Sequence, residues 1–177
     1  SKAMGPDNLS PCVLKELATV LAEPVATIYR KSLELEAVPN DWINARVVPT
    51  YKKGQRYDCA NYRPISLTCI LCKVMEHIVV SHIMKHTQTN NILYHFQHGF
   101  RNKRSCETQL LEFIDDVAKN MDNGVQTDLC ILDFAKAFDK VGHKRLLEKL
   151  KWYGIDGVTN RWIEQLLTGR TQSVVLD

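Results

Sequence analysis

The stretch LCILDFAKAFDKVGH, residues 129–143, places a carboxylate directly after an apolar run. The compact, mostly apolar run from Asp128 to Leu132 predicts a buried strand, and Asp133 follows at its carboxyl end. Ligand sites of open sheets form at such strand ends, and carboxylate oxygens are ligands that Mg²⁺ prefers. A strand-end aspartate that caps the next turn explains the same pattern. The residues alone leave both interpretations open.

Length and composition are those of one ordinary globular domain. The chain has 177 residues, of which 45% are hydrophobic and 24% charged, so it can bury a core. Its net charge of +3 neither favours nor excludes nucleic acid as a partner. Six cysteines without a signal-peptide pattern predict a reduced, intracellular protein. The most apolar segment, ILCKVMEHIVV, contains Lys73, Glu76 and His77, so no membrane partner is expected.

Helical periodicity accounts for most of the remaining chain. It predicts helices over residues 10–36, 69–86, 105–121, 143–153 and 157–168. Ser10 and Pro11 fit the N-terminal positions of the first helix, and Ser105 fits the N-cap of the third. Pro24 is expected to split or kink the first helix.

Two short strands are predicted at residues 47–51 and 62–67, joined as a hairpin by a polar loop. Pro49 and Pro64 predict that both are edge strands. A further strand is expected to begin at Thr171. The alternation of helices and short strands predicts an α+β class, with α/β-like alternation and a small antiparallel sheet.

Other acids near Asp133 are weaker candidates for chemistry. Asp139 follows Asp133 by six residues, which on a helix points the two carboxylates to different sides, so Asp139 is interpreted as structural. Asp115 and Asp116 fall on the solvated face of the helix predicted over residues 105–121.

The spacing of two cysteines and two histidines resembles that of the ligands in a zinc finger. They are Cys69, Cys72, His82 and His86. The span between the pairs is shorter than in zinc fingers and has a helical pattern. The pattern therefore favours two small apolar thiols on a helix face and exposed histidines, with zinc as a minor alternative.

Five stretches resemble motifs of the reverse transcriptases of non-LTR (LINE-type) retrotransposons. They are KAMGPDNLSPCVLKEL, VPNDWINARVVPTYKKG, NYRPISLTCILCKVMEHIV, QHGFRNKRSCETQLL and ILDFAKAFDKVGHKRLLEKLKWYGI, the last being similar to the family's motif A. They follow one another in the family's order and cover nearly the whole chain. Each match alone is modest, but together they identify the chain as a member of that family.

The resemblance implies a right-hand polymerase that copies RNA into DNA. Residues 1–125 are expected to form a fingers-like subdomain with the hairpin at 46–67 and helices at 69–86 and 105–122. Residues 126–177 are expected to form the first part of the palm. The implied reaction is nucleotidyl transfer assisted by two metal ions, Mg²⁺ or Mn²⁺. RNA template, DNA primer and dNTP are the implied partners, and an endonuclease domain is implied upstream.

The same resemblance assigns roles within motif A. It makes Asp133 the catalytic, metal-binding aspartate, assisted by the backbone carbonyl of Phe134. Phe138 matches the aromatic steric gate that lies under the sugar and excludes a 2′-hydroxyl. Phe134 and Phe138 are thus both expected beside the incoming nucleotide. Plain core packing of Phe138 stays open as an alternative.

Basic residues of the hairpin and of the loop before Ser105 complete the implied site. Arg63, Lys53 and Lys52 are expected to hold the triphosphate, because fixed cations suit its charge. A solvated basic loop is the alternative. The expected template contacts are Gln97, Gly99, Phe100, Arg101 and Arg104.

The chain departs from the family at some motif positions. These are Met4, Asn8, Cys106 and Ala135, and none removes a catalytic group. Motifs B and C are expected beyond residue 177, in a longer protein, since the chain also starts without Met. Without the aspartates of motif C, the chain alone is expected not to polymerise. The alternative is a degenerate or domesticated remnant that binds RNA or a protein.

Overall fold

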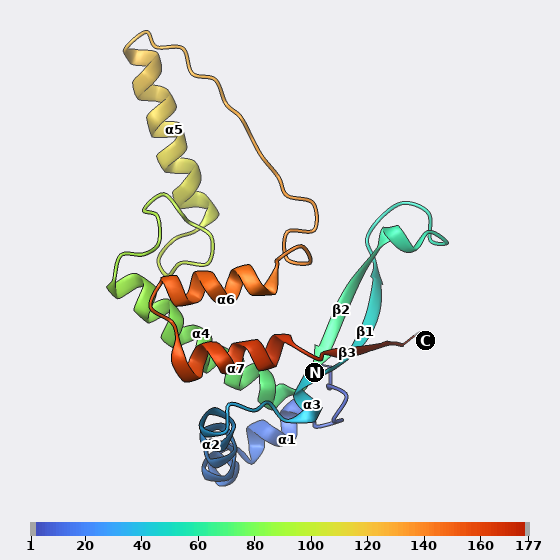
Figure 1. Ribbon diagram of the computed structural model, residues 1–177. Coiled ribbons are helices and arrows are strands. Elements are labelled where there is room, and N and C mark those ends of the chain that lie inside the picture. The colour runs from blue at the N-terminus through green and yellow to red at the C-terminus, as the bar shows by residue number, and fades with distance from the viewer. Residues whose placement is uncertain (1–2, 176–177) are drawn as a thin grey trace. The chain divides into compact units, whose positions relative to one another are not determined.

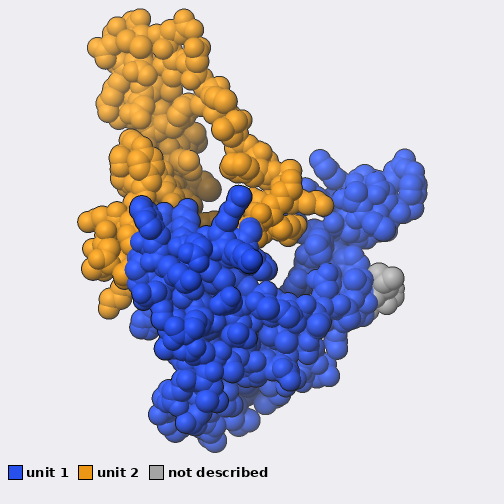
Figure 2. Space-filling model, in the orientation of Figure 1, with its two compact units in different colours: residues 1–84, 142–177 blue, residues 85–141 orange. Residues whose placement is uncertain are grey.

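The computed structural model describes residues 3–175, which form α-helices and one small three-stranded sheet (Figure 1). The predicted α+β class is confirmed. The chain divides into two compact units (Figure 2): the first comprises the described residues up to Met84 and from Gly142 onward, and the second residues 85–141. The predicted boundary at residue 125 refers to the larger polymerase architecture and stays a prediction.

The sheet of the first unit has the strand order β2-β1-β3. Strand β1 (Asn44–Tyr51) pairs antiparallel with β2 (Tyr62–Thr68), which confirms the predicted hairpin. Strand β3 (Thr171–Val174) pairs parallel with the first half of β1, so the sheet is mixed rather than wholly antiparallel. Beyond the end of β3, β1 and β2 continue as a two-stranded hairpin (Figure 1).

The strand prolines lie where the sheet needs no N–H donor. Pro49 and Pro64 are directly opposite each other, and the β1–β3 register ends at Val47. The N–H of Lys52 donates to the carbonyl of Asn61 at 2.9 Å, so these two residues form a hydrogen-bonded pair. Hydrogen-bonded and non-hydrogen-bonded pairs alternate along an antiparallel ladder. Pro49 and Pro64 lie three positions farther along and therefore form a non-hydrogen-bonded pair. The prediction of two edge strands is therefore wrong for β1, because β3 covers the half of β1 that precedes Pro49.

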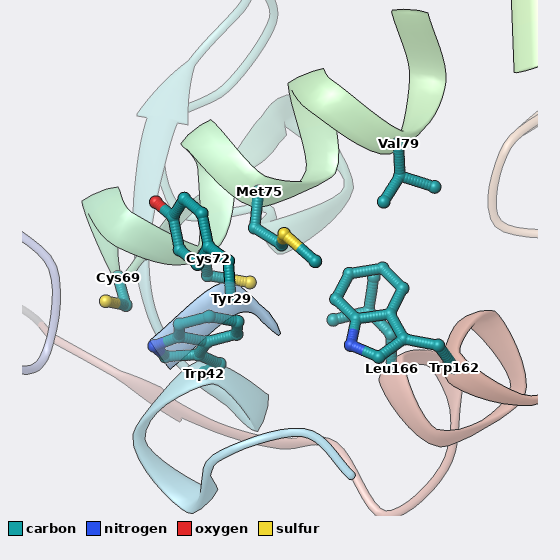
Figure 3. Close-up of a cluster of buried hydrophobic side chains, with 8 residues drawn as sticks. All are labelled: Tyr29, Trp42, Cys69, Cys72, Met75, Val79, Trp162 and Leu166. Atoms are coloured by element: carbon teal, nitrogen blue, oxygen red, sulfur yellow. The ribbon is translucent and has the colours of Figure 1, made fainter. Parts of the chain in front are cut away.

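Helices of the first unit enclose a core of large side chains (Figure 3). They are α2 (Ala18–Glu34), α3 (Asn40–Ile43), α7 (Gly157–Leu167) and the part of α4 (Ile70–Thr89) that precedes Lys85. Trp162 is 1% exposed, and its indole N–H donates to Ser32 Oγ at 2.9 Å. The hydroxyl of Tyr29 donates to the carbonyl of Leu71 at 2.8 Å. The buried polar atoms of both rings therefore keep partners.

The two cysteines of the pattern that resembles a zinc finger are part of this core. Cys69 and Cys72 are buried, and Cys72 Sγ lies 3.2 Å from Glu76 Oε1. Burial raises the pKa of Cys69 to about 11 and also raises that of Cys72. A thiol held in its neutral form is a poor metal ligand. Within residues 3–175, no three His, Cys, Asp or Glu side chains are grouped as a metal site.

The first predicted helix is interrupted, but not at its proline. Helix α1 (Pro11–Glu16) ends at Glu16, Leu17 separates it from α2, and α2 runs through Pro24. The expected split at Pro24 is therefore wrong, and the alternative of a kink there stays a prediction. A proline deprives the carbonyl four residues earlier, that of Val20, of its helical donor. Val20 is 72% exposed, so water can take the donor's place.

The remaining predicted helices are confirmed, and each of their ends lies within three residues of the predicted one. In the first unit, α6 (His143–Trp152) is joined to α7 by a turn that Asn160 stabilises. The buried Asn160 amide donates to the carbonyls of Leu147 and Ile155 at 3.0 and 3.1 Å. In the second unit, α5 (Cys106–Asp122) begins at a capping box formed by Ser105 and Thr108. No helix of the described chain is long and apolar enough to cross a membrane.

The strand predicted over residues 128–132 is absent from the second unit. This segment has no regular secondary structure, and Ile131 and Leu132 are 81% and 80% exposed. The prediction of a buried strand is therefore wrong for this structure. A strand needs a neighbour for its N–H and C=O groups. Among the described residues, strands occur in the sheet of the first unit, and none of them pairs with 128–132.

Candidate functional site

The β1–β2 hairpin concentrates positive charge. Its basic side chains are Arg46, Lys52, Lys53, Arg56 and Arg63, and Asp58 is its one acid. The Asp58 carboxylate accepts a hydrogen bond from the backbone N–H of Ala60 at 2.9 Å instead of pairing with a cation. The hairpin therefore presents uncompensated positive charge, which suits phosphate groups.

The three predicted phosphate ligands all lie on this hairpin. Arg63 is opposite Thr50, and its side chain is exposed on the sheet face shared with Thr50. Lys52 and Lys53 begin the connecting loop and are also exposed. None of the three cations forms an ion pair with another described residue. Their head groups are accessible to a ligand, and the contact with a triphosphate stays a prediction.

Asp133 lies in the second unit, two residues before a turn at residues 135–140. It is exposed and forms no hydrogen bond or ion pair with another described residue. The capping bond that a purely structural aspartate would make is therefore not present in the described chain. Asp139, which was expected to be structural, is also exposed and forms no such bond.

The aromatic residues of motif A are exposed as well. Phe134 and Phe138 are 80% and 79% exposed, so the alternative that Phe138 packs in a core does not hold for this unit. The rings of Phe138 and Phe100 meet edge to face with centroids 6.3 Å apart. This contact brings a predicted nucleotide contact next to a predicted template contact.

The oxygen donors at Asp133 match the chemistry of Mg²⁺ but form an incomplete set. A carboxylate and the carbonyl of Phe134 are the kinds of ligand that a hard cation takes. However, Asp133 is not grouped with two other ligating side chains anywhere in the described chain. The described residues therefore do not make a complete metal site by themselves.

The predicted template contacts lie in the loop before α5. Phe100 is 83% exposed and has a positive φ of 60°. Gln97 Nε2 donates to the carbonyl of Gly99 at 3.2 Å, and Arg101 donates to the carbonyl of Tyr94 at 3.1 Å. Arg104 differs from these residues because its guanidinium is engaged with the carboxylate of Glu112. The structure thus assigns Arg104 an internal contact in addition to its predicted role.

Comparison with known protein families identifies the family to which these motifs belong. Residues 51–176 match the family described as reverse transcriptase (RNA-dependent DNA polymerase). The chain belongs to the reverse transcriptase family. The matched residues of this reverse transcriptase chain include Lys52, Lys53, Arg63, the loop before α5 and Asp133.

Relatives of the reverse transcriptase chain come from mobile elements, which confirms the motif resemblance. An RNA-directed DNA polymerase from the mobile element jockey of Drosophila melanogaster is 29% identical over 85% of this chain and 16% of the relative. A probable RNA-directed DNA polymerase from transposon BS of the same species is 28% identical over 87% of the chain and 18% of the relative. The chain therefore spans less than one fifth of the length of these relatives.

The sequence did not predict one feature of the reverse transcriptase chain, a buried histidine that links the loop before α5 to that helix. His98 is 5% exposed, and its Nδ1 and Nε2 lie 2.9 Å from Thr108 Oγ1 and Glu112 Oε2, respectively. Arg104 also contacts both His98 and Glu112. The available signal was the spacing of Thr108 and Glu112, four residues apart on one face of a helix that follows a basic loop.

Glu112→Gln is expected to destabilise the loop at neutral pH. The hydrogen bond from His98 and the neighbouring Arg104 hold the pKa of Glu112 below its ordinary value of 4.5. A lowered pKa contributes stability above pH 4.5, and this contribution is lost as the pH falls through the folded-state value. Urea denaturation should show a difference between wild type and variant at about pH 7 that shrinks at about pH 3.5. Asp122→Asn, an exposed acid at the end of α5, should show no such difference.

Proposed function

We propose that this chain forms the fingers and the first part of the palm of a retrotransposon polymerase that synthesises DNA on an RNA template. The observation that carries the proposal is the family match over residues 51–176, which includes the hairpin loop with Lys52 and Lys53, strand β2 with Arg63, and Asp133. The matched relatives are RNA-directed DNA polymerases of mobile elements. RNA template, DNA primer and dNTP are the proposed partners, and an endonuclease domain upstream is a further expectation from the resemblance.

Asp133 is proposed to supply one carboxylate to a site for two metal ions, Mg²⁺ or Mn²⁺, with the carbonyl of Phe134 beside it. Such ions stabilise the charge that develops on the attacking and leaving oxygens. The exposed and unpaired state of the Asp133 carboxylate supports this role. Since the described chain does not complete the ligand set, we expect the 177-residue chain alone not to polymerise.

The hairpin cations are proposed to bind the triphosphate of the incoming nucleotide. Arg63 presents a planar guanidinium suited to two-point contact with phosphate oxygens, while Lys52 and Lys53 add compact charges. Phe138 is proposed to lie under the sugar, where a ring excludes a 2′-hydroxyl. The exposure of all four side chains leaves them accessible for these contacts.

The loop before α5 is proposed to contact the template strand. Gln97, Gly99, Phe100, Arg101 and Arg104 supply a polar turn, an exposed ring and positive charge. Exposed rings stack on bases, and basic side chains bind the phosphate backbone. Arg101 remains exposed in part while donating to the Tyr94 carbonyl, so its other N–H groups are available.

Replacing Arg63 tests the proposed function directly. In a polymerase extended through motifs B and C, Arg63→Ala should raise KM for dNTP by about 10- to 100-fold, the loss expected for a charge-assisted contact. Arg63→Lys should restore part of the affinity. Arg145→Ala on α6, also exposed, is the matched control and should leave KM unchanged. An extended chain that binds RNA but never extends a primer would instead favour the non-catalytic remnant.

A further inference from the structure

The loop joining β1 to β2, residues 52–61, is fastened at both ends by tyrosine hydroxyls. The hydroxyl of Tyr51 donates to the carbonyl of Gly54, and that of Tyr62 donates to the carbonyl of Arg56 at 2.7 Å. Tyr51 and Tyr62 lie opposite each other in the register, and their rings meet edge to face with centroids 5.7 Å apart. Each hydroxyl therefore reaches past the end of its strand and holds part of the loop.

Asn61 closes the loop over Gly54. Gly54 has a φ of +91°, and a Cβ there would come within 2.6 Å of Asn61 Nδ2. That amide nitrogen donates to the carbonyl of Gln55 at 3.0 Å. The missing side chain at Gly54 thus gives Asn61 the space to bridge the loop. The guanidinium of Arg56 lies over the ring of Tyr51, 5.3 Å from its centroid, and adds a further contact to the same tyrosine.

These contacts restrain the part of the hairpin that carries the proposed phosphate ligands. Lys52 and Lys53 lie between Tyr51 and Gly54, the two residues that the first hydroxyl bond connects. Arg63 directly follows Tyr62, the donor of the second. An exposed loop without such bonds samples many conformations, and ordering it upon binding costs affinity.

We propose that Tyr51 and Tyr62 are positioning residues that hold Lys52, Lys53 and Arg63 ready for the triphosphate. The proposal rests on the proposed function of the hairpin and adds two residues whose hydroxyls bond to the loop backbone. They act through the backbone of the loop, so removing their hydroxyls should affect nucleotide binding without altering the chemical step.

Hydrogen exchange tests the restraint independently of activity. In the full-length polymerase, the double variant Tyr51→Phe/Tyr62→Phe keeps the ring pair and loses both hydroxyl bonds. Amides of residues 54–60 should then exchange about tenfold faster, as expected when hydrogen bonds that close a loop are removed. Tyr57→Phe is the matched control, because Tyr57 belongs to the same loop, is 83% exposed and forms no hydrogen bond with another described residue.

Steady-state kinetics then test the consequence for nucleotide binding. The double variant should raise KM for dNTP about five- to tenfold and leave kcat within about twofold, the pattern of lost ground-state binding. Tyr57→Phe should match the wild type in both constants. Unchanged exchange, or unchanged KM in the double variant, overturns the positioning role.

The Arg63→Ala variant distinguishes a failure of the positioning role from a failure of the proposed triphosphate site. If Arg63→Ala raises KM while the double variant does not, the positioning role fails and the nucleotide site stands. If neither raises KM although the loop exchanges faster, the assignment of the hairpin to the triphosphate fails, and the positioning role fails with it.

Discussion

Asp133→Asn is expected to reduce DNA synthesis by the full-length polymerase by about 10³-fold or more in kcat/KM, a loss on the scale of removing a principal electrostatic contact in a transition state. Asparagine keeps the size of the side chain and removes its charge. In the described chain the Asp133 carboxylate is exposed and pairs with no other residue, so its charge is available for a cation. The measurement is primer extension on an RNA template at saturating Mg²⁺.

Asp116→Asn is the control for this experiment. Asp116 is an exposed acid on α5, and the substitution makes the same change in charge outside motif A. Synthesis by this variant should remain within about twofold of the wild type, as for an ordinary surface substitution. Retained synthesis by Asp133→Asn, or equal losses in the two variants, would contradict the assignment of Asp133.

Trp162→Ala should lower the free energy of unfolding of this chain by about 3–5 kcal/mol, the range for removing a large buried aromatic side chain. Trp162 is 1% exposed within the core of Figure 3, and the substitution also removes the indole donor to Ser32. Because α7 would lose its hydrogen bond to α2 and a large fully buried side chain, the loss should be visible as an earlier urea transition.

Trp152→Ala provides the matched comparison. Trp152 ends α6 and is 83% exposed, so its removal leaves no cavity. The free energy of unfolding should change by no more than about 0.5 kcal/mol, as for most surface substitutions. Similar transitions for the two variants would mean that the core is not organised around Trp162.

The helices and the hairpin were predictable from the sequence because local signals determine them. Apolar periodicity located α4 to α7, and the box of Ser105 and Thr108 fixed the start of α5. The positive charge of the hairpin was equally predictable, because Lys52, Lys53 and Arg63 are read directly from the sequence beside the two predicted strands. The functional roles came from the order of the motifs, which periodicity alone does not contain.

The two failed strand predictions and the missed role of His98 concern contacts with residues that local sequence does not specify. The run at 128–132 has the composition of a buried strand, but strand formation needs a neighbour that local sequence cannot specify. The central position of β1 depends on β3, which pairs with it across more than a hundred residues. His98 looked like an ordinary loop residue, because its partners Thr108 and Glu112 lie in the first two turns of a later helix.

The discontinuous first unit has a consequence for synthesis on the ribosome. The bond between Ser32 and Trp162 spans 130 residues, so the part of α2 that Trp162 covers emerges long before α7. At about 5–20 residues per second, that interval is roughly 7–26 s. During this time Ser32 and the part of α2 around it lack the ring of Trp162. Premature termination between the two segments would release a polypeptide prone to aggregate.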